Sequence, residues 1–320
     1  MKVFDNEHVQ LHQSNASELP VDDESIDCVV TSPPYWGLRD YGVDEQIGLE
    51  STPEKYVENM VNVFREIKRV LKSSGTVWLN LGDSYVSGKG RYSSGAQTIS
   101  GKSRNEPMNG KRPDQRLHPV MKDKDLAGIP WMVVFALRAD GWYLRSDIIW
   151  NKPNPMPESV KDRPTKSHEY IFLLTKSPTY YYDADAIREK PVPHAPDKPP
   201  TSRKQPYFGQ PSQRTTDNGY TPHYESPEAG RNKRSVWTVN THPYPDAHFA
   251  TFPEKLVEPC ILAGSPLGGT VLDPFVGSGT TLAVAQRLGR KAIGTDISSE
   301  YLELASKRLE KVALPMMLNI

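Results

Sequence analysis

The sequence predicts an α/β fold, in which about seven mostly parallel strands form a sheet with helices on both faces. Short apolar, β-branched runs alternate with longer segments whose apolar residues recur at helical spacing, and turn-forming residues separate them. The strand-like runs are apolar on both faces, which is typical of a parallel sheet covered on both sides. The chain has 320 residues, of which 37% are hydrophobic, so it can bury a large core of this kind.

Residues 26–175 supply six strand or helix signals in a clear order. Residues 26–31 (IDCVVT) lie between an acidic turn and Pro33-Pro34, as expected of a buried strand. Thr52 and Pro53 form a helix start, because a hydroxyl cap precedes an early proline. The expected elements are a strand at 26–31, a helix starting at 51–54 and ending at 73–75, a strand at 76–81, a helix near 125–139, and strands near 142–150 and at 168–175.

The last 70 residues return to alternating helices and strands around a Gly-rich turn. The expected elements are a helix around 253–263, a strand at 270–272, a helix at 280–288, a strand at 291–295 and a helix from 298 to about 312. Two polar segments interrupt the α/β pattern. Residues 84–125 hold nine Lys/Arg against four Asp/Glu, and nine prolines lie between 191 and 227. We therefore expect a flexible basic insertion at 84–125 and a second irregular insertion at 183–235.

Composition excludes several classes of protein. Lys+Arg and Asp+Glu both number 39, so a uniformly basic nucleic-acid coat is excluded while a local basic cleft is not. No run of 18 apolar residues and no signal peptide are present, so no membrane segment is expected. Cys28 and Cys260 form neither a disulfide framework nor a zinc set, and the eight histidines lack ligand spacing. These features predict a cytoplasmic protein without a metal site.

Residues 273–281 (DPFVGSGTT) lie between a predicted strand and a predicted helix. Gly277 and Gly279 allow a tight turn and a close approach of a ligand to the backbone. Asp296 ends the following strand, where a carboxylate can accept hydrogen bonds from ribose hydroxyls. The pattern therefore predicts a cofactor that contains a nucleoside.

The same turn distinguishes between two such cofactors. A dinucleotide fingerprint needs a third small residue near position 282, where this chain has Leu282. An acid at Asp273 would repel a pyrophosphate but attract a cationic aminoacyl group. We therefore expect S-adenosylmethionine and not NAD.

Residues 31–36 (TSPPYW) follow directly on the strand at 26–31. The two prolines stiffen the backbone and remove N–H donors, which leaves carbonyls free to accept hydrogen bonds. Ser32 Oγ and the Pro33 carbonyl could accept from the exocyclic amine of a planar ring, and Tyr35 could stack on that ring. The sequence thus predicts a site for an aromatic amine.

The motifs TSPPYW and DPFVGSGTT, in this order, resemble those of the β group of amino-group DNA methyltransferases. The segments HFATFPEKL at 248–256, NLGDSY at 80–85 and SDIIWNKP at 146–153 extend the resemblance over nearly the whole chain. The resemblance implies a Rossmann-like S-adenosylmethionine-dependent methyltransferase fold with irregular DNA-recognition insertions. It also implies methyl transfer to a base that is flipped out of double-stranded DNA.

The resemblance assigns roles to segments and residues. It implies a catalytic half at 1–83 and 126–182, a target-recognition region at 183–235 and a cofactor-binding half at 236–320. The implied catalytic residues are Ser32, Pro33, Pro34 and Tyr35. The implied cofactor-binding residues are Asp273, Pro274, Phe275, Gly277, Ser278, Gly279, Thr280, Asp296, Phe252 and Asn15, the last in a segment where the family often has an acid. Candidate phosphate contacts are Lys89, Arg91, Lys102, Arg104, Lys111, Arg112, Arg116, Arg203, Lys204, Arg214, Arg231, Lys233 and Arg234.

The sequence constrains the target base less than the fold or the cofactor. In this family a Ser at the position of Ser32 is more typical of cytosine-N4 enzymes, and an Asp is typical of adenine-N6 enzymes. We therefore predict a cytosine-N4 DNA methyltransferase of a restriction–modification system. Adenine-N6 methylation stays open because a neutral hydroxyl can serve either amine, and a DNA-binding protein without catalysis is the alternative from another class. The oligomeric state is also open, and the family is compatible with a homodimer.

Overall fold

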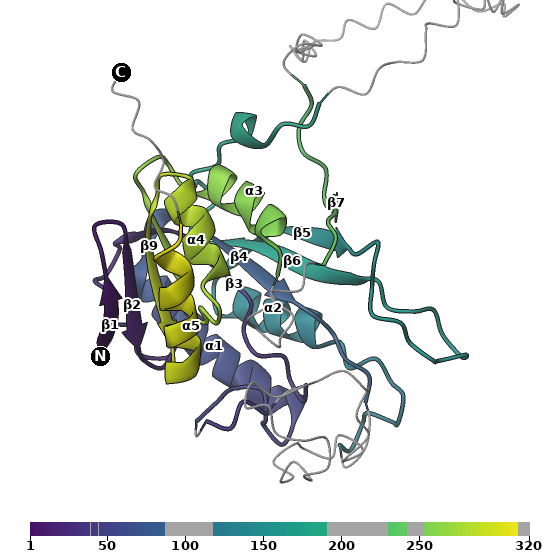
Figure 1. Cartoon of the computed structure of the whole chain (residues 1–320). Helices are drawn as coiled ribbons and strands as arrows, with labels where there is room; N and C mark the ends of the chain where they lie inside the picture. The colour runs from purple at the N-terminus through teal and green to yellow at the C-terminus, as the bar shows by residue number, and fades with distance from the viewer. Residues whose placement is uncertain (39, 44, 87–117, 191–229, 242–251, 313–320) are drawn as a thin grey trace, which may run out of the picture.

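The computed structural model describes residues 1–38, 40–43, 45–86, 118–190, 230–241 and 252–312 (Figure 1). The strands of the described part are β1 (Lys2–Asp5), β2 (Val9–Gln13), β3 (Ile26–Thr31), β4 (Leu71–Leu81), β5 (Tyr143–Asn151), β6 (His168–Thr175), β7 (Val236–Thr238), β8 (Thr270–Asp273) and β9 (Lys291–Asp296). The helices are α1 (Pro53–Val70), α2 (Ile129–Ala139), α3 (Glu254–Gly264), α4 (Thr280–Arg287), α5 (Ser299–Leu309) and the short 3₁₀ helix η2 (Asp185–Ile187).

All nine described strands form one sheet, in the order β1-β2-β9-β8-β3-β4-β6-β5-β7. The five neighbouring strands β2, β9, β8, β3 and β4 are parallel, so their carboxyl ends meet at one edge. Strand β6 runs antiparallel between β4 and β5. Its amino end, at His168 and Glu169, therefore lies at the same edge as the carboxyl end of β4.

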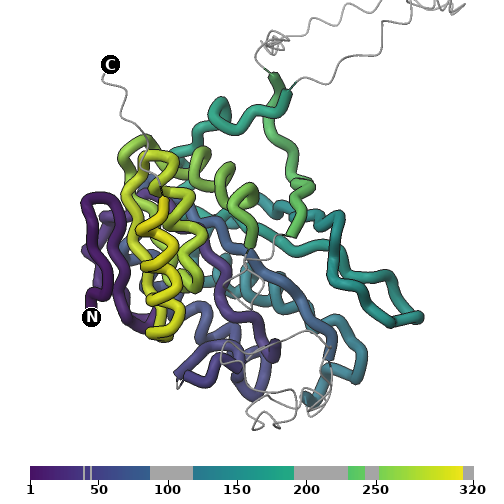
Figure 2. Tube along the Cα trace, in the orientation of Figure 1, coloured from purple at the N-terminus to yellow at the C-terminus, as the bar shows by residue number. Residues whose placement is uncertain are grey.

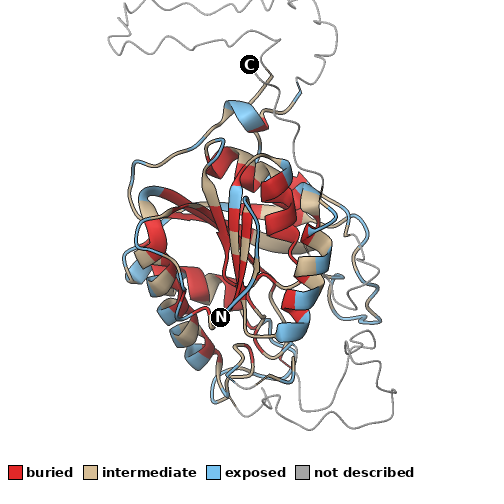
Figure 3. Cartoon of the chain, turned by 60° about the vertical axis from the view of Figure 1, so that its left-hand side comes forward, coloured by how far each residue is buried: buried red, intermediate tan, exposed pale blue. Residues whose placement is uncertain are grey.

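Helices cover both faces of this sheet, as the alternation of side chains along the strands requires. On β3, Cys28 and Val30 pack in the cluster that contains the buried residues of α3, α4 and α5. Ile26 and Val29 pack in the other cluster, with the buried residues of α1 and α2. Figure 3 shows the buried residues concentrated in the sheet and on the inner sides of the helices. The predicted α/β fold with two covered faces is therefore confirmed.

Several element boundaries differ from the sequence prediction. Strand β4 begins at Leu71, directly after α1, instead of at residue 76. Helix α2 begins at Ile129 instead of near residue 125, because the Asp83 carboxylate accepts hydrogen bonds from the N–H groups of Gly128 (3.0 Å) and Ile129 (3.1 Å). The expectation of about seven strands is too low, since the sequence pattern did not identify β1, β2 and β7.

The predicted halves of the chain share this single sheet. Strand β7, from the predicted cofactor-binding half, pairs with β5 and not with β8 or β9. The tube trace shows β1 and β2 at the opposite end of the sheet, and a long segment between β5 and β6 that projects from the fold (Figure 2). Of the two predicted insertions, at 84–125 and 183–235, residues 87–117 and 191–229 lie outside the described part of the chain.

Candidate active site

The carboxyl edge of the parallel strands gathers the predicted site residues. Asn15 follows β2, Asp296 ends β9, Asp273 ends β8 and Ser32 follows β3. Since β2, β9, β8 and β3 are neighbours in this order, motifs that are distant in the sequence form one row. In open α/β sheets, ligands bind in the crevice outside the carboxyl ends of the strands, which is the edge that carries these residues.

Asp273 connects the two main motifs. Its Oδ1 accepts from Thr31 Oγ1 at 2.7 Å and from the Phe275 N–H at 3.1 Å, and its Oδ2 accepts from Thr281 Oγ1 at 2.7 Å. The side chain is buried. Burial raises the pKa of this carboxyl to about 6, although the three hydrogen bonds act in the opposite direction. The carboxylate thus fixes the strand end before Ser32 against the Gly-rich turn.

The Gly-rich turn between β8 and α4 has the conformation that its glycines permit. Gly277 and Gly279 have φ values of 49° and 80°, in the left-handed region that other residues avoid. Asp296 holds this turn, because its Oδ2 accepts from the Gly277 N–H at 3.0 Å and its Oδ1 from the Ser298 N–H at 2.9 Å. Burial raises the pKa of Asp296 to about 6. Two carboxyls with raised pKa values, Asp273 at the start of the turn and Asp296 at the end of β9, therefore hold the predicted cofactor motif.

The other predicted cofactor residues have distinct surroundings. The Thr280 hydroxyl accepts from Arg308 Nη1 at 2.9 Å, and the same guanidinium lies 3.4 Å from the Ser278 carbonyl. The Pro274 carbonyl accepts from Thr295 Oγ1 at 3.0 Å. Phe252 packs against the α3–α5 cluster and Phe275 against the α1–α2 cluster. Asn15 Oδ1 accepts from the Ser17 N–H at 3.1 Å, so this side chain stabilises its own turn.

The predicted catalytic motif is held by polar contacts from three other elements. Tyr56 of α1 donates to the Pro34 carbonyl at 2.9 Å. Ser32 Oγ donates to Tyr35 Oη at 3.3 Å, and Tyr35 Oη donates to Glu169 Oε2 at 2.8 Å. Asn80 of β4 donates to Tyr35 Oη at 2.8 Å and to Glu169 Oε2 at 3.0 Å. The orientation of the Tyr35 ring is therefore set from β4 and β6.

Glu169 is a partly buried carboxylate, with its side chain 15% exposed, and a cation lies beside it. Its Oε1 accepts from Lys152 Nζ, which also lies 4.2 Å from the centroid of the Trp150 ring. Burial alone would raise the pKa of Glu169, but the Lys152 charge and the hydrogen bonds from Tyr35 and Asn80 hold it below its ordinary value. Burial and the neighbouring Glu169 charge raise the pKa of the Tyr35 phenol well above its usual range. Glu169 is thus ionised next to a neutral tyrosine.

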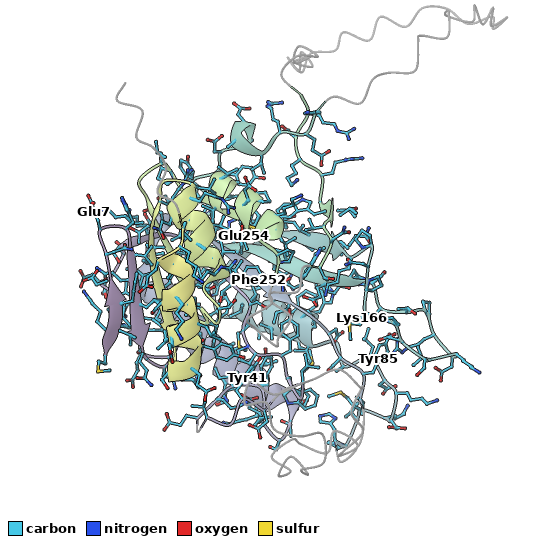
Figure 4. The ribbon with its side chains drawn as sticks, in the orientation of Figure 1. Glu7, Tyr41, Tyr85, Lys166, Phe252 and Glu254 are labelled. Carbon is cyan, nitrogen blue, oxygen red and sulfur yellow. The ribbon has the colours of Figure 1, made fainter. Side chains whose placement is uncertain are left out.

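A narrow, mostly apolar pocket opens between Asn80 and Phe252. Its remaining lining residues are Val30, Thr31, Trp78, Ile171, Leu256, Val257 and Cys260. Figure 4 shows Phe252 near the centre of the molecule. Asn80 is 5% exposed, and its Oδ1 accepts no hydrogen bond from any described residue. A buried acceptor of this kind is stabilised when a ligand donates to it.

Sequence reasoning missed Asn80, Lys152 and Glu169. Two of them, Asn80 and Lys152, stand in the segments NLGDSY and SDIIWNKP, which carry the family resemblance, but the residues alone imply no role for them. Glu169 reaches the site only because β6 is antiparallel to β4, in the register that pairs Ile171 with Asn80. An acid at the amino end of a strand does not indicate a site residue unless the direction of that strand in the sheet is known.

The predicted DNA contacts fall largely outside the described residues. Of the candidate phosphate contacts, the structure describes Arg231, Lys233 and Arg234. Arg231 and Arg234 both pair with Glu189, at 3.1 Å and 3.0 Å, and Lys233 lies 4.9 Å from the centroid of the Trp237 ring. Within the described ranges, no group of three or more potential metal ligands occurs, and no helix has the length and apolar character needed to cross a bilayer.

Comparison with known proteins gives matches over nearly the whole chain. A family model described as DNA methylase matches residues 26–307. The chain is 48% identical over 286 residues to the type II methyltransferase M.Cfr9I of Citrobacter freundii, covering 89% of this chain and 82% of that protein. It is 46% identical over 289 residues to the type II methyltransferase M.SmaI of Serratia marcescens, covering 90% and 86%.

Solved structures share the fold. The PvuII DNA methyltransferase, described as cytosine-N4-specific, aligns with a TM-score of 0.63 at 18% identity, covering 94% of this chain and 86% of that one. A putative DNA modification methylase of Thermus thermophilus, TTHA0409, solved with S-adenosyl-L-methionine, aligns with a TM-score of 0.56 at 22% identity, covering 96% and 94%. The predicted methyltransferase fold is thus confirmed.

Proposed function

Because the chain belongs to the DNA methylase family of amino-group methyltransferases, we propose that it transfers the methyl group of S-adenosylmethionine to the N4 amine of cytosine in double-stranded DNA. The observation that supports this most is the hydrogen bond from Thr31 to Asp273, which joins the SPPY motif to the Gly-rich turn. The type II methyltransferase relatives and the cytosine-N4-specific PvuII neighbour are consistent with it. Ser32 at the first motif position favours cytosine over adenine.

The described residues fit S-adenosylmethionine. The turn at Gly277–Gly279 has the left-handed backbone that its glycines permit, and Asp296 ends the adjacent strand, where ribose hydroxyls bind in related folds. Asp273 adds negative charge beside a ligand that carries a sulfonium and an ammonium. The unpartnered Asn80 Oδ1 offers an acceptor next to Phe252. When bound, the cofactor supplies an electrophilic methyl group.

The residues of this chain contribute position and charge. A cytosine flipped out of the duplex would present its amine to Ser32 Oγ and the Pro33 carbonyl. These acceptors favour a more tetrahedral nitrogen, so that its lone pair points toward the cofactor instead of into the ring. Orienting the two reactants supplies most of the rate enhancement in such a displacement. Acceptors aimed at the nitrogen also stabilise the positive charge that develops on it.

The wider setting follows from the same proposal. Phosphate contacts from the basic segments would give salt-dependent binding to duplex DNA, and the target sequence would be read by 183–235. The protein would act in the cytoplasm as the modification enzyme of a restriction–modification system. It needs no metal ion, since neither acceptor contact requires one.

The proposal is tested by expressing the chain in a bacterium whose DNA lacks N4-methylcytosine. Genomic DNA is extracted, digested to nucleosides and analysed by mass spectrometry. We expect N4-methylcytosine in cells that carry the wild-type chain and none above background in cells that carry Ser32→Ala at equal protein level. N6-methyladenine in place of N4-methylcytosine would overturn the base assignment.

A further inference from the structure

We propose that Glu169 accepts the proton that the target amine releases, through a hydrogen-bonded chain that runs from Ser32 by way of Tyr35. This inference rests on the proposed function, because it takes the amine to be bound at Ser32. It concerns a step that the motif alone does not explain. Methylation adds a carbon to a nitrogen that already carries two protons, and one of them must leave.

The two hydrogen bonds from Ser32 to Glu169 donate in the same direction. Ser32 Oγ donates to Tyr35 Oη at 3.3 Å, and Tyr35 Oη donates to Glu169 Oε2 at 2.8 Å. A hydroxyl both donates and accepts, whereas an ionised carboxylate only accepts. The chain therefore begins at a group placed to accept from the amine and ends at a base.

Two carboxylates of the described residues make hydrogen bonds to the segment 31–35, and only Glu169 is suited to take the proton. Both oxygens of Asp273 already accept from hydroxyls of Thr31 and Thr281. Those hydroxyls belong to the strand end and to α4, and no hydrogen bond within the described ranges links them to the Ser32 side chain. The Tyr35 hydroxyl, by contrast, connects Glu169 to the Ser32 side chain.

Lys152 and Asn80 keep the Glu169 carboxylate ionised and in position. The Lys152 ammonium pairs with Glu169 Oε1, so the carboxylate stays ionised although it is partly buried. The Asn80 amide donates to both Tyr35 Oη (2.8 Å) and Glu169 Oε2 (3.0 Å), which keeps the last two groups of the chain in contact. Even a weakly basic carboxylate suffices, since an aromatic amine that bears an extra substituent and a positive charge is a strong acid.

The proposed step balances in atoms and charge. As the amine nitrogen bonds to the methyl carbon, the bond between that carbon and sulfur breaks and its electron pair stays on sulfur. One amine proton moves to Ser32 Oγ, the Ser32 proton moves to Tyr35 Oη, and the Tyr35 proton moves to Glu169 Oε2. The sulfonium charge and the carboxylate charge are both lost, and the methylated amine is neutral.

Two substitutions interrupt the chain at different points. Glu169→Gln keeps an oxygen that can accept from Tyr35 but removes the base, and Tyr35→Phe keeps the ring but removes the relay hydroxyl. We expect each to lower the single-turnover rate of methyl transfer by about 100-fold, a usual size for general base catalysis. The double variant should be no more than about threefold slower than the slower single variant, because both changes interrupt the same proton relay.

Three readouts distinguish this role from a structural one. The dissociation constants for S-adenosylmethionine and for DNA should stay within about twofold of wild type in both variants. Glu169→Asp, which restores a carboxylate, should recover part of the rate. The residual rate of Glu169→Gln should rise with pH as solvent hydroxide replaces the carboxylate, whereas the wild-type rate should be flat above neutral pH.

Glu66→Gln is the matched control. Glu66 is also a partly buried carboxylate paired with a cation, Arg69, but it lies on α1 and contacts Leu19. Its substitution should leave the transfer rate within about twofold. A Glu169→Gln rate within threefold of wild type would overturn the proposal. So would losses that multiply in the double variant, or a rate loss matched by weaker binding of both ligands.

The proposed function and this inference can fail separately. The methylated base made by wild type tests the former, and the ratios among variants test the latter. A wild-type enzyme that methylates adenine would overturn the cytosine assignment, yet the rate ratios would still measure the relay, since that amine also has a proton to lose.

Discussion

Thr31 Oγ1 donates a 2.7 Å hydrogen bond to Asp273 Oδ1 across a separation of 242 residues in the chain. The contact is possible because β3 and β8 are parallel neighbours, so their carboxyl ends coincide. It connects the motif that would hold the amine with the turn that would hold the cofactor. Asp273 is therefore the residue at which the two halves of the site can be separated by experiment.

Asp273→Asn should weaken S-adenosylmethionine binding by about tenfold or more without lowering thermal stability at pH 7. The amide removes the negative charge from the site and keeps an oxygen that accepts from Thr31. The Thr281 hydroxyl can donate to the Val30 carbonyl, 3.2 Å away, and accept from the new NH2 group. Burial disfavours the ionised carboxyl of Asp273. Replacing it with a neutral amide therefore does not lower the free energy of unfolding at pH 7 through loss of the charge. Calorimetric titration and thermal melts of the same samples measure both quantities.

Asp162→Asn is the matched control for that change. Asp162 is an exposed carboxylate paired with Lys124 at 2.7 Å, distant in the sequence from both motifs. Its substitution should leave the dissociation constant for the cofactor unchanged within about twofold. Equal affinity of wild type and Asp273→Asn would show that the Asp273 charge does not act on the cofactor.

Cofactor affinity should fall as the pH is lowered through about 6. Asp273 and Asp296 both have a pKa of about 6, raised by burial, and a cationic ligand binds the ionised forms better. For one such group the dissociation constant rises about tenfold between pH 8 and pH 5. Titrations at fixed ionic strength over this range measure the change, and an affinity that is constant from pH 8 to pH 5 would contradict it.

The same two carboxyls have the opposite effect on folding. Their folded pKa values lie above the ordinary value of 3.8, so their contribution to stability is present below about pH 4 and is lost as the pH rises through about 6. Acid should therefore weaken cofactor binding while protonation of these two carboxyls favours the folded state. This difference separates loss of ligand from unfolding in the titration above.

Gly82→Ala should displace Tyr35. A Cβ at Gly82 would lie 2.5 Å from Tyr35 Cε2 and 3.3 Å from Glu169 Cδ, so the ring must move out of its contact with Glu169. We expect the methyl-transfer rate to fall at least tenfold, with cofactor affinity within about twofold. Gly264→Ala is the control, because its Cβ would instead meet Thr76, Trp78 and Cys28. That variant should lower the melting temperature while the folded protein keeps its rate.

Lys152→Met should move the acid limb of the rate profile to higher pH. The substitution removes the cation that lowers the pKa of Glu169, so that carboxyl will take up a proton at a higher pH. The rate should then fall with decreasing pH earlier than in wild type, and recover when the pH is raised. Single-turnover rates between pH 5 and pH 9 measure this. Coincident profiles for the two proteins would mean that the charge of Lys152 does not govern the acceptor.

The sequence predicts the elements with strong local signals and misses those that depend on pairing. Strand β6 is found at its predicted bounds, His168–Thr175, because its residues form a continuous apolar run. Helix α1 starts as predicted, with Thr52 Oγ1 accepting from the Lys55 N–H at 3.3 Å. The sequence does not predict strand β2, because only two apolar residues mark it and its partner, β9, is distant in the chain.

The same distinction applies to the site. The two motifs identify Ser32 and Asp273 because each follows a strand with a recognisable apolar pattern. The contacts of Glu169 depend on the antiparallel register of β4 and β6, which pairs Leu81 with Tyr170. No local pattern encodes that register. The acceptor end of the proposed relay therefore becomes visible only in three dimensions.

The most direct test of the account is the identity of the base that purified protein methylates. Unmethylated genomic DNA of mixed composition is incubated with S-adenosylmethionine that carries a deuterated methyl group, and the digested nucleosides are resolved by mass spectrometry. The account predicts deuterated N4-methylcytosine, formed by wild type and not by Ser32→Ala. Label found in N6-methyladenine alone, or in no nucleoside while the protein binds both cofactor and DNA, would contradict it.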